Sequence, residues 1–130
     1  MSLTVSPELL AAAERGQVGE PEFLDCVRES LPYAYALVER LAGELPSAAG
    51  VFVDNQVPPP DERAQGELLR AMASTSIRGA LERRFGVALA FQNCHRVAAF
   101  RPSAVDGPEH KRFVSVTGQL LNQQPGFVNC

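Results

Sequence analysis

Four consecutive residues carry the side chains best suited to chemistry. Asn93, Cys94, His95 and Arg96 stand between the apolar runs "VALAF" and "VAAF". A cysteine becomes a nucleophile when a nearby base lowers the pKa of its thiol, and histidine commonly serves as that base. The quartet therefore indicates either a reactive site or a polar turn between two apolar segments.

The cysteine and histidine of this quartet are badly placed to act on each other. Neighbouring residues on a strand point to opposite faces, and on a helix they diverge by about 100°. Cys94 would need His110 as its base, or a turn that folds it against His95, with Cys26 as a resolving thiol. We favour the alternative that Cys94 is a small buried hydrophobic residue and that His95 is a loop or partly buried polar residue. No catalytic residue is assigned, and Cys94, His95 and His110 are candidates only.

A second group of polar residues precedes three prolines, in "DNQVPPP". Asp54 and Asn55 could hydrogen-bond a ligand that is held against the stiff, extended prolines. The competing interpretation is a simple turn, which an Asp-Asn pair often forms. Together with Asn93, His95 and Arg96, these two residues are the candidate ligand-binding residues.

Several arginines are close enough in the sequence to form a basic face: Arg78, Arg83, Arg84, Arg96 and Arg101. Nucleic-acid binding requires such a patch. Glu82 interrupts it, and the chain has a net charge of −3 and a pI near 5.4. The protein therefore has no general attraction for nucleic acid or anionic membranes, and a solvated, salt-bridged helix face is the favoured interpretation.

Motifs that define common enzyme classes are missing from the sequence. It contains no glycine-rich phosphate loop, no HExxH, no GxSxG, no nucleotide fingerprint and no EF-hand loop. The three cysteines, Cys26, Cys94 and Cys130, are far apart and odd in number, which argues against a disulfide framework and against a zinc site. We expect no cofactor and no metal.

The N-terminal stretch "MSLTVSPELLAAAERG" has neither a basic region nor a long apolar run. A secretory signal is therefore not expected. No segment approaches the ~20 apolar residues that a membrane-spanning helix needs. These observations predict a cytoplasmic protein.

The first 45 residues predict two short helices and one longer one. Ser6 is suited to cap the first helix, and a second helix begins near Gly19. Pro32 separates the second helix from the third, because proline lacks an N–H group and its ring crowds the preceding turn. The third helix runs to Leu45, with Arg40 opposite its apolar stripe.

The middle of the chain changes in character. Residues 46–60 predict an ordered crossing loop, with 51–53 as an edge strand, and such long loops are often functional. Asp61 is suited to cap a long helix that ends at Gly86. Ser and Thr at 74–76 predict a kink or a break within it.

Residues 87–101 allow two interpretations. A β-hairpin with the loop "QNCH" is favoured, because Val87, Leu89 and Phe91 alternate with smaller residues. The alternative is a single buried helix, which the many alanines favour. A loop and a last helix, within "EHKRFVSVTGQLLNQQ", follow.

The expected fold is mainly α (α+β), with four to five helices packed with one short β-hairpin at about residues 87–101. A chain of 130 residues suffices for one core, so we expect a single globular domain over residues 1–130. Tyr33, Tyr35 and Phe52 would leave apolar surface that a homodimer could cover.

Four stretches, "DNQVPPPDE", "IRGALERRFG", "FQNCHRVAAFRP" and "GQLLNQ", resemble a family of small, uncharacterised actinobacterial proteins of about 130 residues. The resemblance covers nearly the whole chain. It implies a bacterial cytoplasmic protein and carries no activity, ligand or catalytic residue with it.

The composition and the motifs together favour a non-enzymatic binding or regulatory module that acts through a protein partner or a small ligand. The alternative is a thiol-based enzyme or redox site in which Cys94 works with a histidine base. Nucleic-acid binding by the arginine face is the weaker alternative.

Overall fold

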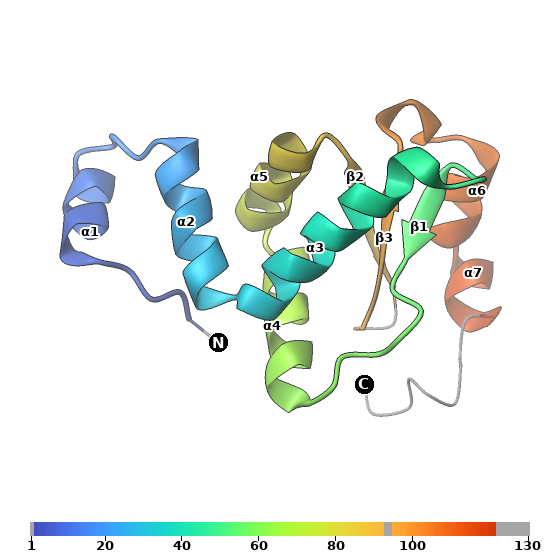
Figure 1. Ribbon diagram of the computed structural model, residues 1–130, viewed down its shortest axis with the longest axis horizontal. Helices are drawn as coiled ribbons and strands as arrows, with labels where there is room; N and C mark the ends of the chain where they lie inside the picture. The colour runs from blue at the N-terminus through green and yellow to red at the C-terminus, as the bar shows by residue number, and fades with distance from the viewer. Residues whose placement is uncertain (1, 93–94, 122–130) are drawn as a thin grey trace.

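The computed structural model describes residues 2–92 and 95–121. Its α-helices are α1 (Pro7–Glu14), α2 (Glu20–Ser30), α3 (Pro32–Glu44), α4 (Glu62–Ala73), α5 (Thr75–Phe85), α6 (Pro108–Phe113) and α7 (Val116–Leu121). Two short 3-10 helices, η1 (Leu45–Ser47) and η2 (Pro102–Ala104), lie between these elements. The strands are β1 (Phe52–Asp54), β2 (Ala88–Gln92) and β3 (Arg96–Phe100). Figure 1 shows α1 and α2 at one end of the molecule and α6 and α7 at the other.

Polar side chains fix where several helices begin. The Ser6 hydroxyl accepts a hydrogen bond from Leu9 N–H at 3.1 Å, and so caps α1. The Ser74 hydroxyl accepts one from Ile77 N–H at 3.4 Å, and this cap ends α4 and begins α5. The predicted break at 74–76 is therefore confirmed. Gly86, at φ +66°, ends α5 in the left-handed conformation that glycine adopts without strain.

The sheet is antiparallel, with the strand order β1-β3-β2. Phe100 of β3 pairs with Phe52 on one side and with Ala88 on the other. Strands β2 and β3 are adjacent partners over their full lengths, so residues 88–92 and 96–100 form strands and not a buried helix. Strand β1 is the edge strand expected near 51–53, displaced by one residue.

The expected count of four to five helices with one hairpin is wrong. Within the described ranges there are seven α-helices and a three-stranded sheet. The predicted last helix is divided into α6 and α7, because the Ser115 hydroxyl accepts a hydrogen bond from Gly118 N–H at 2.9 Å and caps a new helix. The hairpin becomes a larger sheet because the edge residues 52–54 pair with β3.

The two faces of the sheet support two separate cores. Odd-numbered residues of the strands, such as Leu89, Val97 and Ala99, face α3, α4 and α5, against which α2 also packs. Even-numbered residues face α6, where Ala90, Ala98 and Phe100 meet Phe113: that second core is smaller and rich in aromatic rings. The alternation follows from the pleat of the strands.

The aromatic residues that motivated the homodimer are largely used within the chain. Tyr35 is 7% exposed and meets the Phe85 ring edge-on at 5.5 Å between centroids. Phe52 stacks on Phe100 at 4.7 Å. The homodimer stays a prediction. None of the described helices combines the length and the apolar composition that crossing a membrane requires.

Replacing Phe100 by alanine should destabilise the fold strongly. Its side chain is 0% exposed and touches the rings of Phe52 and Phe113, so Phe100→Ala should lower the free energy of unfolding by about 3–5 kcal/mol. Denaturant unfolding measures this. Leu10→Ala on α1, where Leu10 is 53% exposed, is the control and should change stability by less than about 0.5 kcal/mol. Equal losses in both variants would contradict the second core.

Candidate binding hollow on helix α3

Two of the predicted ligand-binding residues bind each other. Asp54 and Arg96 lie on the α6-facing side of the sheet, on neighbouring strands. The Arg96 Nε donates to Asp54 Oδ2 at 2.8 Å, and Nη2 forms an ion pair with the same oxygen. The two side chains are only 16% and 5% exposed, so most of this contact is shielded from water. Each neutralises the other's charge at the end of the sheet.

Asn55 extends the sheet through its side chain. Its Nδ2 donates to the His95 carbonyl at 2.7 Å, and its Oδ1 accepts from Val97 N–H at 2.8 Å. The side-chain amide therefore occupies the position of a further peptide group beside β3. Asn55 is 1% exposed and His95 is 3% exposed, so both belong to the interior. Asn93 and Cys94 lie outside the described residues.

The other candidates for thiol chemistry are placed far apart. Cys26 is 6% exposed, and its thiol donates to the Thr4 carbonyl at 3.3 Å. The His110 Nδ1 accepts from Asp106 N–H at 3.2 Å, and its ring lies edge-on to Phe100. Cys26 is on α2 and His110 is on α6, at opposite ends of the view in Figure 1.

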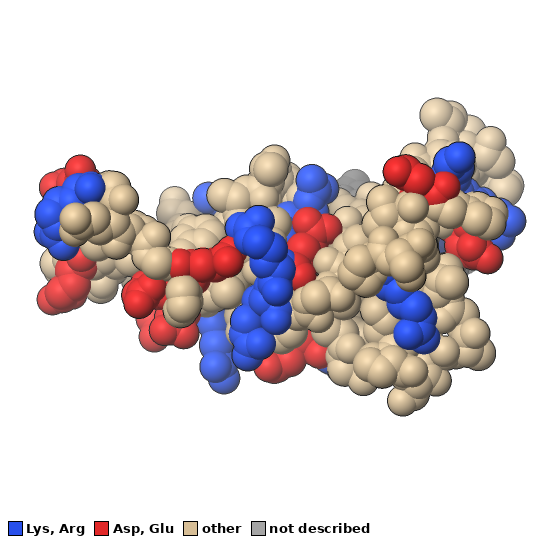
Figure 2. All heavy atoms as spheres, turned by 90° about the horizontal axis from the view of Figure 1, so that it is seen from above, with Lys and Arg blue, Asp and Glu red and all other residues tan. Residues whose placement is uncertain are grey.

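The predicted arginine face is divided among separate contacts. Arg83 pairs with Glu20 at 2.6 Å, and Arg96 pairs with Asp54. Arg101 Nη2 donates to the carbonyls of Leu45 and Ala48, at 3.0 and 3.2 Å. On the face shown in Figure 2, basic and acidic side chains alternate along the surface.

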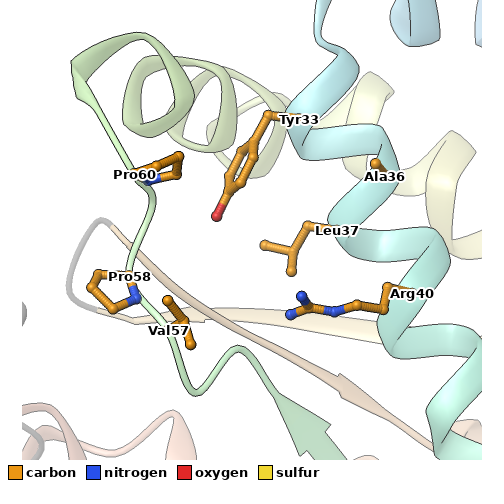
Figure 3. Close-up of a pocket in the computed structure, with 7 residues that line it drawn as sticks. All are labelled: Tyr33, Ala36, Leu37, Arg40, Val57, Pro58 and Pro60. Atoms are coloured by element: carbon orange, nitrogen blue, oxygen red, sulfur yellow. The ribbon is translucent and has the colours of Figure 1, made fainter.

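A hollow of about 400 Å³ lies between α3 and the proline-rich segment, and we call it the α3 hollow. Its walls are formed by Tyr33, Ala36, Leu37, Arg40, Val57, Pro58 and Pro60. In Figure 3 the Tyr33 hydroxyl points into the space between the two walls, and the Arg40 side chain extends from α3 toward Val57. The volume falls within the range of small-ligand pockets.

Tyr33 is held in position by a carboxylate from another helix. Helix α3 begins directly after Leu31, whose side chain cannot cap it. Glu67 of α4 supplies the missing acceptor, because its Oε1 accepts from Tyr33 N–H at 2.7 Å. Glu67 is 2% exposed and also pairs with Arg63, with 3.7 Å between Nε and Oε2. This contact fixes the start of α3, from which the Tyr33 side chain extends into the hollow.

The opposite wall is fixed at both of its ends. Asn55 holds the start of the segment to β3. Asp61 holds its end, because its Oδ1 accepts from Ala64 N–H at 2.8 Å and caps α4. Between them, three consecutive prolines restrict the backbone through their rings. The hollow therefore has one helical wall and one stiff extended wall.

The two polar groups of the hollow are both hydrogen-bond donors at neutral pH. Burial raises the pKa of the Tyr33 phenol, Asp61 and Glu67 raise it further, and Arg40 lowers it. Tyr33 is therefore a neutral phenol. Arg40 is a cation whose Nε lies 3.6 Å from Glu44 Oε1, in a pair whose side chains are 55% and 53% exposed. Such exposed pairs contribute little stability, so Arg40 can change partners at low cost.

The sequence pattern indicated the stiff prolines as one candidate wall but gave no indication of the helical wall. Arg40 was expected opposite the apolar stripe of its helix, although it lies two turns after Tyr33. A spacing of seven residues puts two side chains on the same side of a helix, and this signal could have found the pair. The prolines lie near α3 because of tertiary contacts, and no pattern in the sequence predicts this proximity.

The fold and the hollow define a small α+β protein with a ligand-sized hollow beside a proline-rich segment. The chain belongs to the family described as NucS shadow ORF, whose model matches residues 1–130. The short name of that family begins with the letters KH. Comparison with curated proteins and with solved structures gave no match. The prediction that the whole chain belongs to one family of small proteins is thus confirmed. The actinobacterial source stays a prediction.

Burial of Tyr33 should make the fold less stable at high pH. Its folded pKa lies above the ordinary value of 10.0, so at higher pH the unfolded chain loses this proton first. The stability of the wild type should therefore fall, relative to Tyr33→Phe, as pH rises through about 10, and the difference should be constant near neutral pH. Urea unfolding of both proteins across this range measures the change. A difference that is independent of pH would contradict the raised pKa of the Tyr33 phenol.

Proposed function

We propose that this protein is a non-enzymatic binding module that takes a small amphipathic carboxylate in the α3 hollow. One observation carries the proposal: the only polar side chains that line the hollow, among the described residues, are two donors, the Tyr33 phenol and the Arg40 guanidinium. The remaining lining side chains are apolar. A ligand that satisfies both donors must present acceptors, and a carboxylate presents only acceptors.

The charge of Arg40 favours an anionic head over a neutral one. A guanidinium can bind both oxygens of a carboxylate through parallel hydrogen bonds, which are stronger than hydrogen bonds between neutral groups. Glu44 already offers a carboxylate to Arg40, in an exposed pair. A ligand carboxylate held by Tyr33 as well would replace this weak partner.

The apolar walls favour a compact hydrocarbon body on the ligand. Leu37 is 5% exposed and lies at the base of the hollow, while Val57 is 69% exposed at its rim. Covering this rim removes apolar surface from water, which contributes roughly 25 cal/mol for each Å² buried. The stiff proline wall loses little conformational freedom on binding, so the entropic cost offsets less of the free energy gained by burying apolar surface.

Carboxylates should bind more tightly than alcohols of the same shape. Hexanoate and benzoate are compared with 1-hexanol and benzyl alcohol, by following the backbone NMR signals of Ala36 and Val57. We expect the carboxylates to bind at least about tenfold more tightly, because hydrogen bonds to a charged group contribute about 1.5–3 kcal/mol. Arg40→Gln should abolish this preference while leaving the alcohols unaffected.

Arg15→Gln is the matched control, because Arg15 is an exposed arginine at the end of α1 and lines neither the hollow nor another described cavity that holds a candidate ligand. It should retain the preference for carboxylates. Equal binding of acids and alcohols to the wild type, or no saturable shift of these signals in the millimolar range, would contradict the proposal.

Nucleic acid is a second candidate ligand, because the family's short name contains the letters KH, which also denote a nucleic-acid-binding domain, and the sequence contains a GXXG quartet. KH domains clamp the nucleic-acid backbone with a GXXG loop. The sequence has one such quartet, Gly16–Gly19, between α1 and α2. Glu20 and Glu22 follow it directly in the first turn of α2. These carboxylates oppose the approach of a phosphate, so this candidate ranks below the first.

Single-stranded RNA and DNA should show no salt-dependent binding. Such binding depends on basic side chains that displace counterions from the phosphates. The net charge is −3, and Glu20 and Glu22 follow the quartet, so no such contacts are expected there. Fluorescence anisotropy of labelled oligonucleotides, at rising salt concentration, measures this. Binding that weakens with salt, and that Gln17→Asp and Val18→Asp remove, would instead assign the nucleic-acid function to the GXXG loop.

A further inference from the structure

A second cavity, of about 430 Å³, lies on the other side of the sheet, and we call it the α6 cavity. It is bounded by β1, β3, α6 and α7, through Phe52, Arg96, Glu109, Arg112, Phe113, Thr117, Gly118 and Leu121. None of these residues lines the α3 hollow, so the two spaces are independent.

The floor of the α6 cavity is aromatic. Phe52 and Phe113 meet edge-on, with 6.0 Å between their ring centroids, and the Arg96 guanidinium lies 5.3 Å from the centroid of Phe113. Because Asp54 already pairs with Arg96, this arginine brings little uncompensated charge to the cavity. The floor is therefore suited to an aromatic or other large apolar group.

The rim carries one positive and one negative side chain. Glu109 and Arg112 are three residues apart on α6, both are exposed, and both line the cavity. No ion pair joins them in the part of the chain that the structure describes. The rim thus presents an acceptor and a donor of opposite charge, where the α3 hollow presents two donors.

Helix α7 is held close enough to α6 to close the cavity. The Ser115 hydroxyl donates to the Arg112 carbonyl at 2.7 Å and accepts from Gly118 N–H at 2.9 Å. A Cβ atom at Gly118 would lie 2.1 Å from the Arg112 carbonyl oxygen, so only glycine permits this approach. The Ser115 hydroxyl and Gly118 together therefore fix the spacing between α6 and α7.

We propose that the α6 cavity binds a free α-amino acid with an aromatic or large aliphatic side chain. Its carboxylate pairs with Arg112, its ammonium group pairs with Glu109, and its side chain lies on Phe52 and Phe113. A zwitterion is the ligand class that matches one cation and one anion over an apolar floor, because neither charge is then left without a partner.

Three related compounds test which charges the cavity requires. L-phenylalanine carries both charges, N-acetyl-L-phenylalanine lacks the ammonium group, and L-phenylalaninamide lacks the carboxylate. Binding is followed by the NMR signals of Thr117 and Gly118. We expect L-phenylalanine to bind at least about tenfold more tightly than either derivative.

Two variants assign the charges to residues. Glu109→Gln should remove the advantage of L-phenylalanine over its N-acetyl derivative, and Arg112→Gln should remove its advantage over the amide. Lys111→Gln, at an exposed position of α6 that does not line the cavity, is the control and should change neither. All three α6 positions are exposed, and circular dichroism verifies that each variant is folded.

Equal binding of the three compounds would show recognition of the ring alone and would overturn the proposal. So would the absence of any saturable shift at Thr117 and Gly118 with millimolar L-phenylalanine. Because N-acetyl-L-phenylalanine is itself an amphipathic carboxylate, shifts that it causes at Ala36 and Val57 report on the α3 hollow. The two proposals therefore fail or succeed separately.

Discussion

The central position of strand β3 is the constraint on which the rest of the structure depends. Both edges of β3 are paired, with β1 and with β2, so its backbone groups find partners within the sheet. Residues 97–100 are all 0% exposed, and their side chains alternate between the two faces. A strand buried in this way requires cover on both sides. Helices α3, α4 and α5 provide it on one face, and α6 provides it on the other.

Polar residues at both ends of the sheet support this arrangement, because each of them binds another side chain or the backbone. Asp54 neutralises Arg96, and Asn55 continues the pairing of β1 by its side chain. Arg101 binds the carbonyls of Leu45 and Ala48, at the start of η1 and just after it. Unpaired buried polar groups cost free energy, so each of these contacts removes a penalty. Their consequence for function is indirect. Asn55 sets the course of the proline segment, and Arg96 closes one side of the α6 cavity.

The α3 hollow and the α6 cavity differ in the polar groups that line them, and this difference follows from the elements that form their walls. The α3 hollow lies between a helix and a segment of prolines, which have no N–H groups to offer, so its polar groups come from α3. The α6 cavity takes both signs of charge from one short helix. A chain of this size can thus present two unlike binding surfaces, because a sheet covered on both faces has two separate sets of neighbours.

Local residue patterns in the sequence determined where most of the helices and strands lie. The caps at Ser6 and Asp61, the breaks at Pro32 and at 74–76, and the alternation in residues 87–91 each act over a few residues, so they can be predicted without the fold. The sequence predicted an edge strand near 51–53 but did not determine its pairing with β3, the division of the last helix, or the meeting of Tyr33 with the prolines. These depend on contacts between residues far apart in the chain, such as Glu67 with Tyr33 and Asn55 with Val97. Only the tertiary structure decides such contacts, because each of these side chains has several possible partners until the chain packs.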